Sequence, residues 1–389
     1  MLHTKINEAI DFIKNDLFSN KTCLIYDHII KGREQEFPTA TEISNVFPNP
    51  CGYTTGMEDC MISGATMLDA LIIRYEKEHD KDAADFAKKL VKGMLNCAFS
   101  AKTDGFLPRA VSIEDGKSHY PDSSRDQYTM FAFGMHQYLS STLCTPDERK
   151  DISKAAVGIA RRAERNVTRE TGYDMLTDNG GPTLNNVMWG EKLGNHEYMR
   201  LPMLYLLAYE ASGDKHWWEK YVEIRENAYE GSLHMTDYWA LYTLQQMQAS
   251  VRLCYDVEQN TDWRKRYLSL MNTVADYTEG IIDGVRAKMN SFNNYNDVQH
   301  CFRELKMIPD ERFMRLGHPS AFKIIRCDSN AFFTLQDCAQ VSIITGTTPN
   351  RVLSEKSKRL FNEAFSKIDL SKHERNLPLF FIDGYYRSI

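Results

Sequence analysis

The chain has 389 residues, of which 42% are hydrophobic and 26% are charged, as in an ordinary globular protein with a substantial core. Its 47 basic and 53 acidic residues give a net charge of −6 without a basic block, so nucleic acid and anionic membranes are poor candidates for partners. No apolar run approaches the roughly 20 residues that cross a bilayer, and the N-terminus shows no signal peptide, so we expect a cytoplasmic protein, or a periplasmic one if a signal has been removed.

Helical periodicity dominates the sequence, and no convincing strand alternation appears. An apolar stripe predicts a first helix near residues 5–20. A long helix is expected over residues 57–78 and its partner over 82–98, and the short polar link between them predicts an antiparallel helical hairpin.

Two capping boxes mark the next helix starts. Ser124 and Gln127 have capping-box spacing, which predicts a helix that begins at Arg125. Thr145 and Glu148 have the same spacing and predict the start of its successor. Further helices are expected over residues 197–211, 216–229, 237–256, 262–282, 329–346 and 350–366.

Long loops at roughly residues 99–123, 166–195 and 283–328 separate the helical hairpins. Alternating short and long connections would gather the long loops at one end of a ring of hairpins. The sequence therefore predicts an all-α (α/α)6 toroid, as one domain over residues 1–389. A solenoid would show a fixed repeat period, which is not seen. A two-domain helical protein is the other alternative, but no low-complexity linker marks a boundary.

Nine cysteines are scattered without CxxC pairs or other metal-ligand spacing. Cys97, Cys254 and Cys338 lie in apolar helices, which indicates reduced core residues. No cofactor and no metal is called for by any motif in the chain.

The first candidate site combines a polar loop with the helix that begins at Arg125. Asp126 falls in the first turn of that helix, where free N–H groups and the positive end of the helix favour an ionised carboxylate. Arg109 and Arg125 could pair with local carboxylates or bind an acidic sugar through two parallel hydrogen bonds. Tyr128 could stack on a sugar ring, as could Trp189 in a later loop.

Three further polar segments each precede a predicted helix. His196 is suited to acid–base work because its ordinary pKa lies near 6.5, and Glu197 adjoins it. A lone histidine at a helix start can equally be a cap or a packing residue. The other two segments supply three candidate binding residues, which are Asp237, Trp239 and Arg326. Asp237 can equally be a simple N-cap.

Two stretches resemble the unsaturated glucuronyl and rhamnogalacturonyl hydrolases of the six-hairpin glycosidase group. Residues 125–134, RDQYTMFAFG, are similar to the helix start that carries one catalytic aspartate in that group, and the resemblance implies that role for Asp126. Residues 199–214, MRLPMLYLLAYEASGD, resemble a later helix that follows the second aspartate. At that second position this chain has His196, with Glu197 next to it.

The resemblance implies a helical toroid that protonates and hydrates the double bond of an unsaturated uronic acid. Asp126 would work with another partner, or Glu197 would take the second role, or the site would run other chemistry. Our hypothesis is a carbohydrate-active enzyme, a glycoside hydrolase that acts on small oligosaccharides. The alternatives are a polysaccharide lyase or sugar epimerase on the same toroid, and a sugar-binding helical protein without catalysis. The sugar and the oligomeric state are left open.

Overall fold

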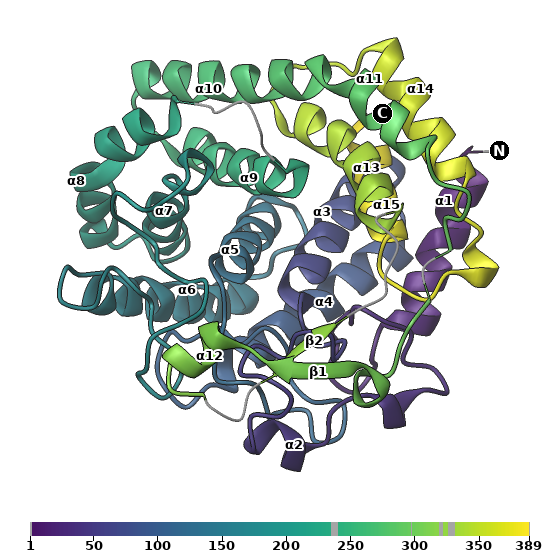
Figure 1. Ribbon diagram of the computed structural model, residues 1–389. Helices are drawn as coiled ribbons and strands as arrows, with labels where there is room; N and C mark the ends of the chain where they lie inside the picture. The colour runs from purple at the N-terminus through teal and green to yellow at the C-terminus, as the bar shows by residue number, and fades with distance from the viewer. Residues whose placement is uncertain (1, 235–239, 297, 319–321, 326–330, 389) are drawn as a thin grey trace.

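Six helices form a closed inner ring in the computed structural model, which describes residues 2–388 except 235–239, 297, 319–321 and 326–330 (Figure 1). They are α3 (Cys60–Glu78), α5 (Arg125–Ser140), α7 (Arg200–Ser212), α9 (Leu241–Val257), α13 (Ala331–Thr347) and α15 (Pro378–Ser388). Each helix packs against the next in that order, and α15 packs back against α3. Across the ring, α3 is therefore opposite α9, and α5 is opposite α13.

A second layer of helices surrounds this ring (Figure 1). It consists of α1 (Leu2–Phe12), α4 (Lys81–Phe99), α6 (Pro146–Asn166), α8 (Lys215–Ser232), α10 (Thr261–Gly280) and α14 (Glu355–Ser366). Each outer helix packs against at least one inner helix, and α1 packs against α15, so the two chain termini complete the same hairpin. The double ring confirms the predicted all-α (α/α)6 toroid.

Shorter elements decorate the toroid. The short helices are α2 (Ala40–Ser44), α11 (Ile282–Met289) and α12 (Glu311–Arg315), with the π-helical turn η1 (Ile13–Leu17). The 3-10 turns are η2 (Glu34–Glu36), η3 (Asn195–Glu197), η4 (Phe302–Glu304) and η5 (Leu370–Lys372). Strands β1 (Lys306–Pro309) and β2 (Phe322–Ile325) form an antiparallel pair in which Lys306 faces Ile325. This pair falls within the long loop predicted after α10.

The connections alternate in length around the ring. Short links follow α3, α5, α7 and α9 and lead to the next outer helix, whereas the longer ones precede α3, α5, α7 and α13. The inner helices therefore run parallel, with their N-terminal ends and the long loops at the same end of the toroid. The positive ends of the helix dipoles gather there. We call this the loop end of the toroid.

The predicted helices correspond to observed ones within a few residues in the described part of the chain, and the first residues of the helices expected over 237–256 and 329–346 lie outside it. Helices α2, α11, α12 and α15 were not predicted. The helix expected from residue 57 begins at Cys60, and Asp59 occupies the N-cap position without a side-chain cap hydrogen bond. Helix α15 carries the continuous apolar run Leu379–Ile382 and is buried on most sides. Such a helix has no polar stripe to reveal its period. It is the sixth inner helix, without which the ring would stay open.

One hydrophobic cluster runs through the toroid, from Ile6 in α1 to Tyr386 in α15. Cys97, Cys254 and Cys338 belong to it and are fully buried, as expected. Among the described helices, none is long and apolar enough to cross a membrane.

The end of the ring opposite the loop end is fixed by buried charge. His136 in α5 is only 2% exposed, with Nδ1 2.8 Å from a Glu210 oxygen and Nε2 3.2 Å from an Asp256 oxygen. Burial alone would lower the pKa of His136, but the two carboxylates raise it to about 9. The imidazolium therefore ties the last turns of α5, α7 and α9 together, where the negative ends of the helix dipoles also favour a cation.

This clamp predicts a stability that falls as the pH rises. Because the folded-state pKa of His136 lies above the ordinary 6.5, its contribution is complete below about pH 6.5 and is lost as the pH passes about 9. We expect the free energy of unfolding to drop by roughly 2–3 kcal/mol across that range. Urea unfolding at several pH values measures it. The His136→Gln variant should be less stable at low pH and lack this pH dependence, and an equal slope in both proteins would contradict the assignment.

Candidate functional site

A cavity of about 760 Å³ lies at the loop end of the toroid, at the N-terminal turns of the inner helices. One side carries four carboxyl side chains, which we call the acidic wall: Asp27, Glu58, Asp59 and Asp126. The side formed by α9 and α13 carries aromatic and amide side chains, which we call the amide wall: Tyr242, Gln245, Gln246, Phe333, Gln336 and Gln340. Since α3 and α5 lie across the ring from α9 and α13, the two walls face each other.

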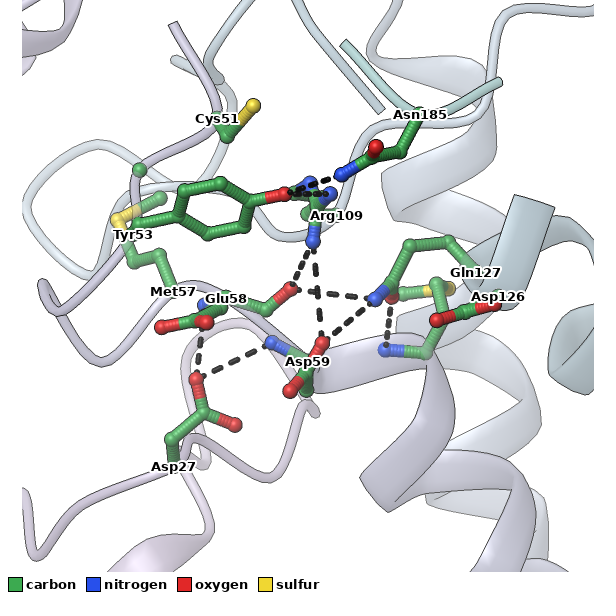
Figure 2. A network of polar contacts seen from close by, with 12 residues as sticks. Asp27, Cys51, Tyr53, Met57, Glu58, Asp59, Arg109, Asp126, Gln127 and Asn185 are labelled. Atoms are coloured by element: carbon green, nitrogen blue, oxygen red, sulfur yellow. Dashed lines mark hydrogen bonds and ion pairs between the residues drawn. The ribbon is translucent and has the colours of Figure 1, made fainter. Parts of the chain in front are cut away.

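Asp59 lies at the centre of the acidic wall (Figure 2). One carboxylate oxygen accepts a hydrogen bond of 2.9 Å from the Gln127 amide and lies 3.8 Å from the Arg109 guanidinium. Gln127 also donates to the Glu58 carbonyl and accepts from the Met61 N–H, which ties the start of α3 to the start of α5. These bonds hold the Asp59 carboxyl in a defined position beside the cavity.

Asp27 holds the backbone of the segment that carries Glu58 and Asp59. Its Oδ2 accepts hydrogen bonds from the backbone N–H groups of Glu58, at 2.8 Å, and Asp59, at 3.1 Å (Figure 2). Burial and the Glu58 carboxylate raise the pKa of Asp27 to about 7. The Asp59 side chain keeps 41% of its surface open, yet burial within the ring raises its pKa well above the ordinary value, and Asp27 and Glu58 raise it further. Asp27 is therefore partly protonated near neutral pH, and burial with the neighbouring carboxylates favours the protonated form of Asp59.

Arg109 lies behind the acidic wall and is only 4% exposed. Its guanidinium donates to the Glu58 carbonyl at 3.0 Å and to the Tyr53 hydroxyl at 3.3 Å, and it stacks on the Tyr53 ring at 4.9 Å. Arg109 was expected to bind substrate directly. Its partners are protein groups, so it positions the segment that carries Asp59.

Asp126 is held by a different environment. It lies in the first turn of α5 and forms an ion pair with the fully buried Arg200 of α7. Burial alone would raise the pKa of Asp126, but Arg200, and to a lesser extent Arg125, lower it below the ordinary value. Asp126 is therefore ionised near neutral pH. This ionised state agrees with the expectation from its place at a helix N-terminus.

Two carboxyl groups with opposite pKa shifts thus line one cavity. The environment of Asp59 favours its protonated form, and the environment of Asp126 favours its ionised form. Their charges act on each other, since Asp126 contributes to the raised pKa of Asp59. Groups whose environments separate their pKa values in this way are suited to acid and base roles in one reaction.

The predicted residues His196, Glu197 and Arg125 form a cluster next to Asp126. Glu197 accepts hydrogen bonds from Arg125 and, at 2.9 Å, from the Gly194 N–H, and lies 3.7 Å from the His196 ring. Burial and the charges of Arg200 and Arg125 lower the pKa of His196 to about 4, so its imidazole is neutral at pH 7. None of the three is among the described residues that line the cavity. Their catalytic and binding roles stay predictions.

The remaining predicted residues have other positions. Tyr128 is fully buried, and its hydroxyl accepts a bond from the Leu107 N–H, so it is a core residue and offers no stacking surface. Trp189 packs edge-on against Tyr198, with ring centroids 5.9 Å apart, and does not line the cavity in the described structure. Three predicted residues lie outside the described part of the chain: Asp237, Trp239 and Arg326.

The capping box predicted at the start of α5 does not form. The helix begins at Arg125 as expected, but the Ser124 side chain makes no cap bond. Gln127 turns toward the start of α3 instead, where its side-chain oxygen accepts from the Met61 N–H and its amide donates to Asp59 and the Glu58 carbonyl. The N-cap position of Asp59 before α3 was a signal that the sequence carried and that our helix boundary at residue 57 missed.

The described residues contain no evident metal-binding site. Among residues 2–388 apart from the four gaps, no group of three or more His, Cys, Asp or Glu side chains is arranged to hold an ion. The carboxyls of the acidic wall instead contact Arg, Gln and backbone N–H groups.

No family model matches the chain, and no curated protein matches its sequence. Among solved structures, a family 76 glycoside hydrolase from a bovine Bacteroides thetaiotaomicron strain is similar, with 11% sequence identity and a TM-score of 0.48. The match covers 99% of this chain and 76% of that one. A likeness this distant does not indicate an activity for this chain.

The ion pair at Asp126 gives a direct test of the site's electrostatics. Replacing Arg200 with Gln should raise the pKa of Asp126 above its ordinary value, because burial then acts with little opposition. Carbon-13 NMR titration of the carboxyl measures the shift. The matched variant Arg125→Gln should raise the pKa less, since Arg125 contributes less than Arg200. An unchanged pKa in Arg200→Gln would refute this account of Asp126.

Proposed function

We propose that the protein is a carbohydrate-active enzyme, a glycoside hydrolase that cleaves small oligosaccharides with Asp59 as general acid and Asp126 as its ionised partner. The observation that carries this proposal is the pair of oppositely shifted carboxyl groups on one cavity. Glycoside hydrolysis needs such a pair, one protonated and one ionised.

In the proposed reaction, Asp59 donates its proton to the glycosidic oxygen as the bond from that oxygen to the anomeric carbon breaks. Asp126 takes a proton from the water that attacks the same carbon, or attacks that carbon itself and is later displaced by water. The anomeric configuration of the first product distinguishes these two routes. The ion pair with Arg200 keeps Asp126 charged for either role.

The amide wall supports a sugar as the substrate. Tyr242 is 46% exposed and Phe333 is 53% exposed, and both line the cavity, so their rings are available to stack on the apolar face of a sugar. Gln245 and Gln336 add amides that can both donate to and accept from hydroxyl groups. The cavity volume lies within the range of sites for small ligands, which favours short oligosaccharides over long chains.

A panel of substrates separates this proposal from its rivals. A hydrolase releases reducing sugar from saturated glycosides. Action on unsaturated uronyl disaccharides, which the sequence resemblance implies, removes the ultraviolet absorbance of the conjugated uronate. A lyase creates that absorbance, an epimerase changes configuration without cleavage, and a sugar-binding protein gives binding without turnover.

Replacement of the two carboxyls tests the catalytic pair. We expect Asp59→Asn and Asp126→Asn each to lower kcat by about 10²–10⁴-fold, since each removes one proton-transfer group. Circular dichroism should show that both variants remain folded. Full activity in either folded variant would remove that residue from the mechanism.

The pH dependence of kcat/KM tests the acid assignment. Activity should fall as the pH rises through the pKa of the acidic cluster, because Asp59 must be protonated to act. Replacing Asp27 with Asn removes a charge that raises the pKa of Asp59, so the alkaline limb should move to lower pH. An alkaline limb that stays in place would argue that another group is the acid.

The exposed rings give a test of the substrate class. Tyr242→Ala and Phe333→Ala should each lower kcat/KM by roughly 3- to 10-fold, as expected for loss of one stacking contact. Val352, which is 78% exposed, provides a control, because Val352→Ala removes an exposed apolar side chain that does not line the cavity. Equal effects of all three substitutions would weigh against stacking.

A further inference from the structure

We propose that Gln246 and Gln340 recognise the sugar ring at the cleavage position and select a neutral, hydroxyl-bearing ring over a uronate. This inference deepens the proposed function and rests on it. It assigns a substrate class that the two catalytic carboxyls do not specify.

The two amides are buried but incompletely bonded. Gln246 in α9 is 4% exposed and Gln340 in α13 is 1% exposed, and both line the cavity. Neither side-chain Oε1 has a hydrogen-bond partner among the described residues. Buried polar atoms are nearly always paired because an unpaired one costs stability. What sets these two amides apart from other unpaired buried groups is that both residues line the cavity, where a ligand hydroxyl could bond to them.

Their place in the ring suits contact with the reacting sugar. Gln246 lies four residues beyond Tyr242, and Gln340 lies four residues beyond Gln336, so each is one helical turn deeper in the cavity on the same helix face. Across the ring from α9 and α13 lie α3 and α5, where Asp59 directly precedes α3 and Asp126 lies in the first turn of α5. A sugar ring that contacts Asp59 on one side would therefore face the amides of Gln246 and Gln340 on the other.

The charges around the cavity favour a neutral ring. Two cations are among its described lining residues, and each already acts on an acid: Lys288 lowers the pKa of Asp337, and Arg375 lowers that of Asp27. Five carboxyl groups outnumber them, namely the four of the acidic wall and Asp337. A uronate would add a further acid to this set and would meet the ionised Asp126, while both cations already act on acids of the cavity. Uncharged amides, which donate and accept, match hydroxyl groups instead.

Leucine substitutions separate recognition from structure. Gln246→Leu and Gln340→Leu should each lower kcat/KM for neutral para-nitrophenyl hexosides by about 10- to 100-fold, the loss expected when a hydrogen bond to substrate is removed. The same variants should unfold at a higher temperature, because an unpaired buried acceptor is gone. A residue kept only for structure would not raise the unfolding temperature when it is removed.

Gln248 provides the matched control on the same helix. It is fully buried and does not line the cavity. Its Oε1 is also unpaired among the described residues, but its amide donates to the Met271 carbonyl at 2.9 Å and to the Thr348 hydroxyl at 2.6 Å. Gln248→Leu should therefore unfold at a lower temperature and keep the kcat/KM of the unchanged protein. This is the opposite pattern from the two cavity variants.

Binding without turnover makes the inference independent of catalysis. Calorimetry on Asp59→Asn should show tighter binding of neutral para-nitrophenyl hexosides than of the matching uronides, and this preference should shrink when Gln246 or Gln340 is also replaced by Leu. Equal or tighter uronide binding, or no binding of any neutral hexoside, would overturn the inference while hydrolysis, if observed, still supports the proposed function. The binding preference without hydrolysis by any variant would instead sustain the inference and overturn the hydrolase assignment.

Discussion

The closed inner ring imposes one constraint on everything else in the molecule, because its six helices must run parallel. Parallel helices place their positive ends together at the loop end and their negative ends together at the other. Carboxyl groups gather at the first end, where Asp59 and Asp126 line the cavity. At the other end, His136 is clamped by two carboxylates and Arg387 by Asp69 and Asp383. The loop end therefore carries the cavity, and the opposite end carries buried ion pairs.

At the loop end, the helix dipoles act on both Asp59 and Asp126, yet the two carboxyl groups differ in protonation state. Asp126 has a buried guanidinium as its direct partner, whereas Asp59 has a neutral amide at hydrogen-bond distance and an arginine farther away. The Asp59 carboxyl also has Asp27 and Glu58 as neighbours. Local partners thus outweigh the helix dipole, which falls off beyond the first turn. Two carboxyls at equivalent helix starts acquire different protonation states, which is the property that acid–base catalysis requires.

Several side chains that line the cavity are in environments that lower the stability of the folded protein. At the end opposite the loop end, the buried His136 is paired with two carboxylates. The amide wall instead leaves Gln246 and Gln340 with unpaired oxygens and Tyr242 and Phe333 with exposed rings. Unpaired buried acceptors and exposed aromatic rings are unfavourable in the protein without ligand. Hydrogen bonds and stacking contacts to a ligand would offset that free-energy cost. Two unpaired acceptors and two exposed rings thus lie together on one wall of the cavity.

The sequence by itself determined the all-α toroid, since helical periodicity, capping signals and alternating loop lengths are local. It also predicted that Asp126 lies in the first turn of a helix, where the ionised carboxylate is favoured. Only the tertiary structure decided which residues accompany Asp126. Asp27, Asp59 and Gln127 come from separate segments and meet through long-range hydrogen bonds that no local pattern encodes. For the same reason Gln127 was assigned to a capping box, Tyr128 to a binding surface, and α15 to no helix, because burial depends on neighbours that ring closure alone supplies.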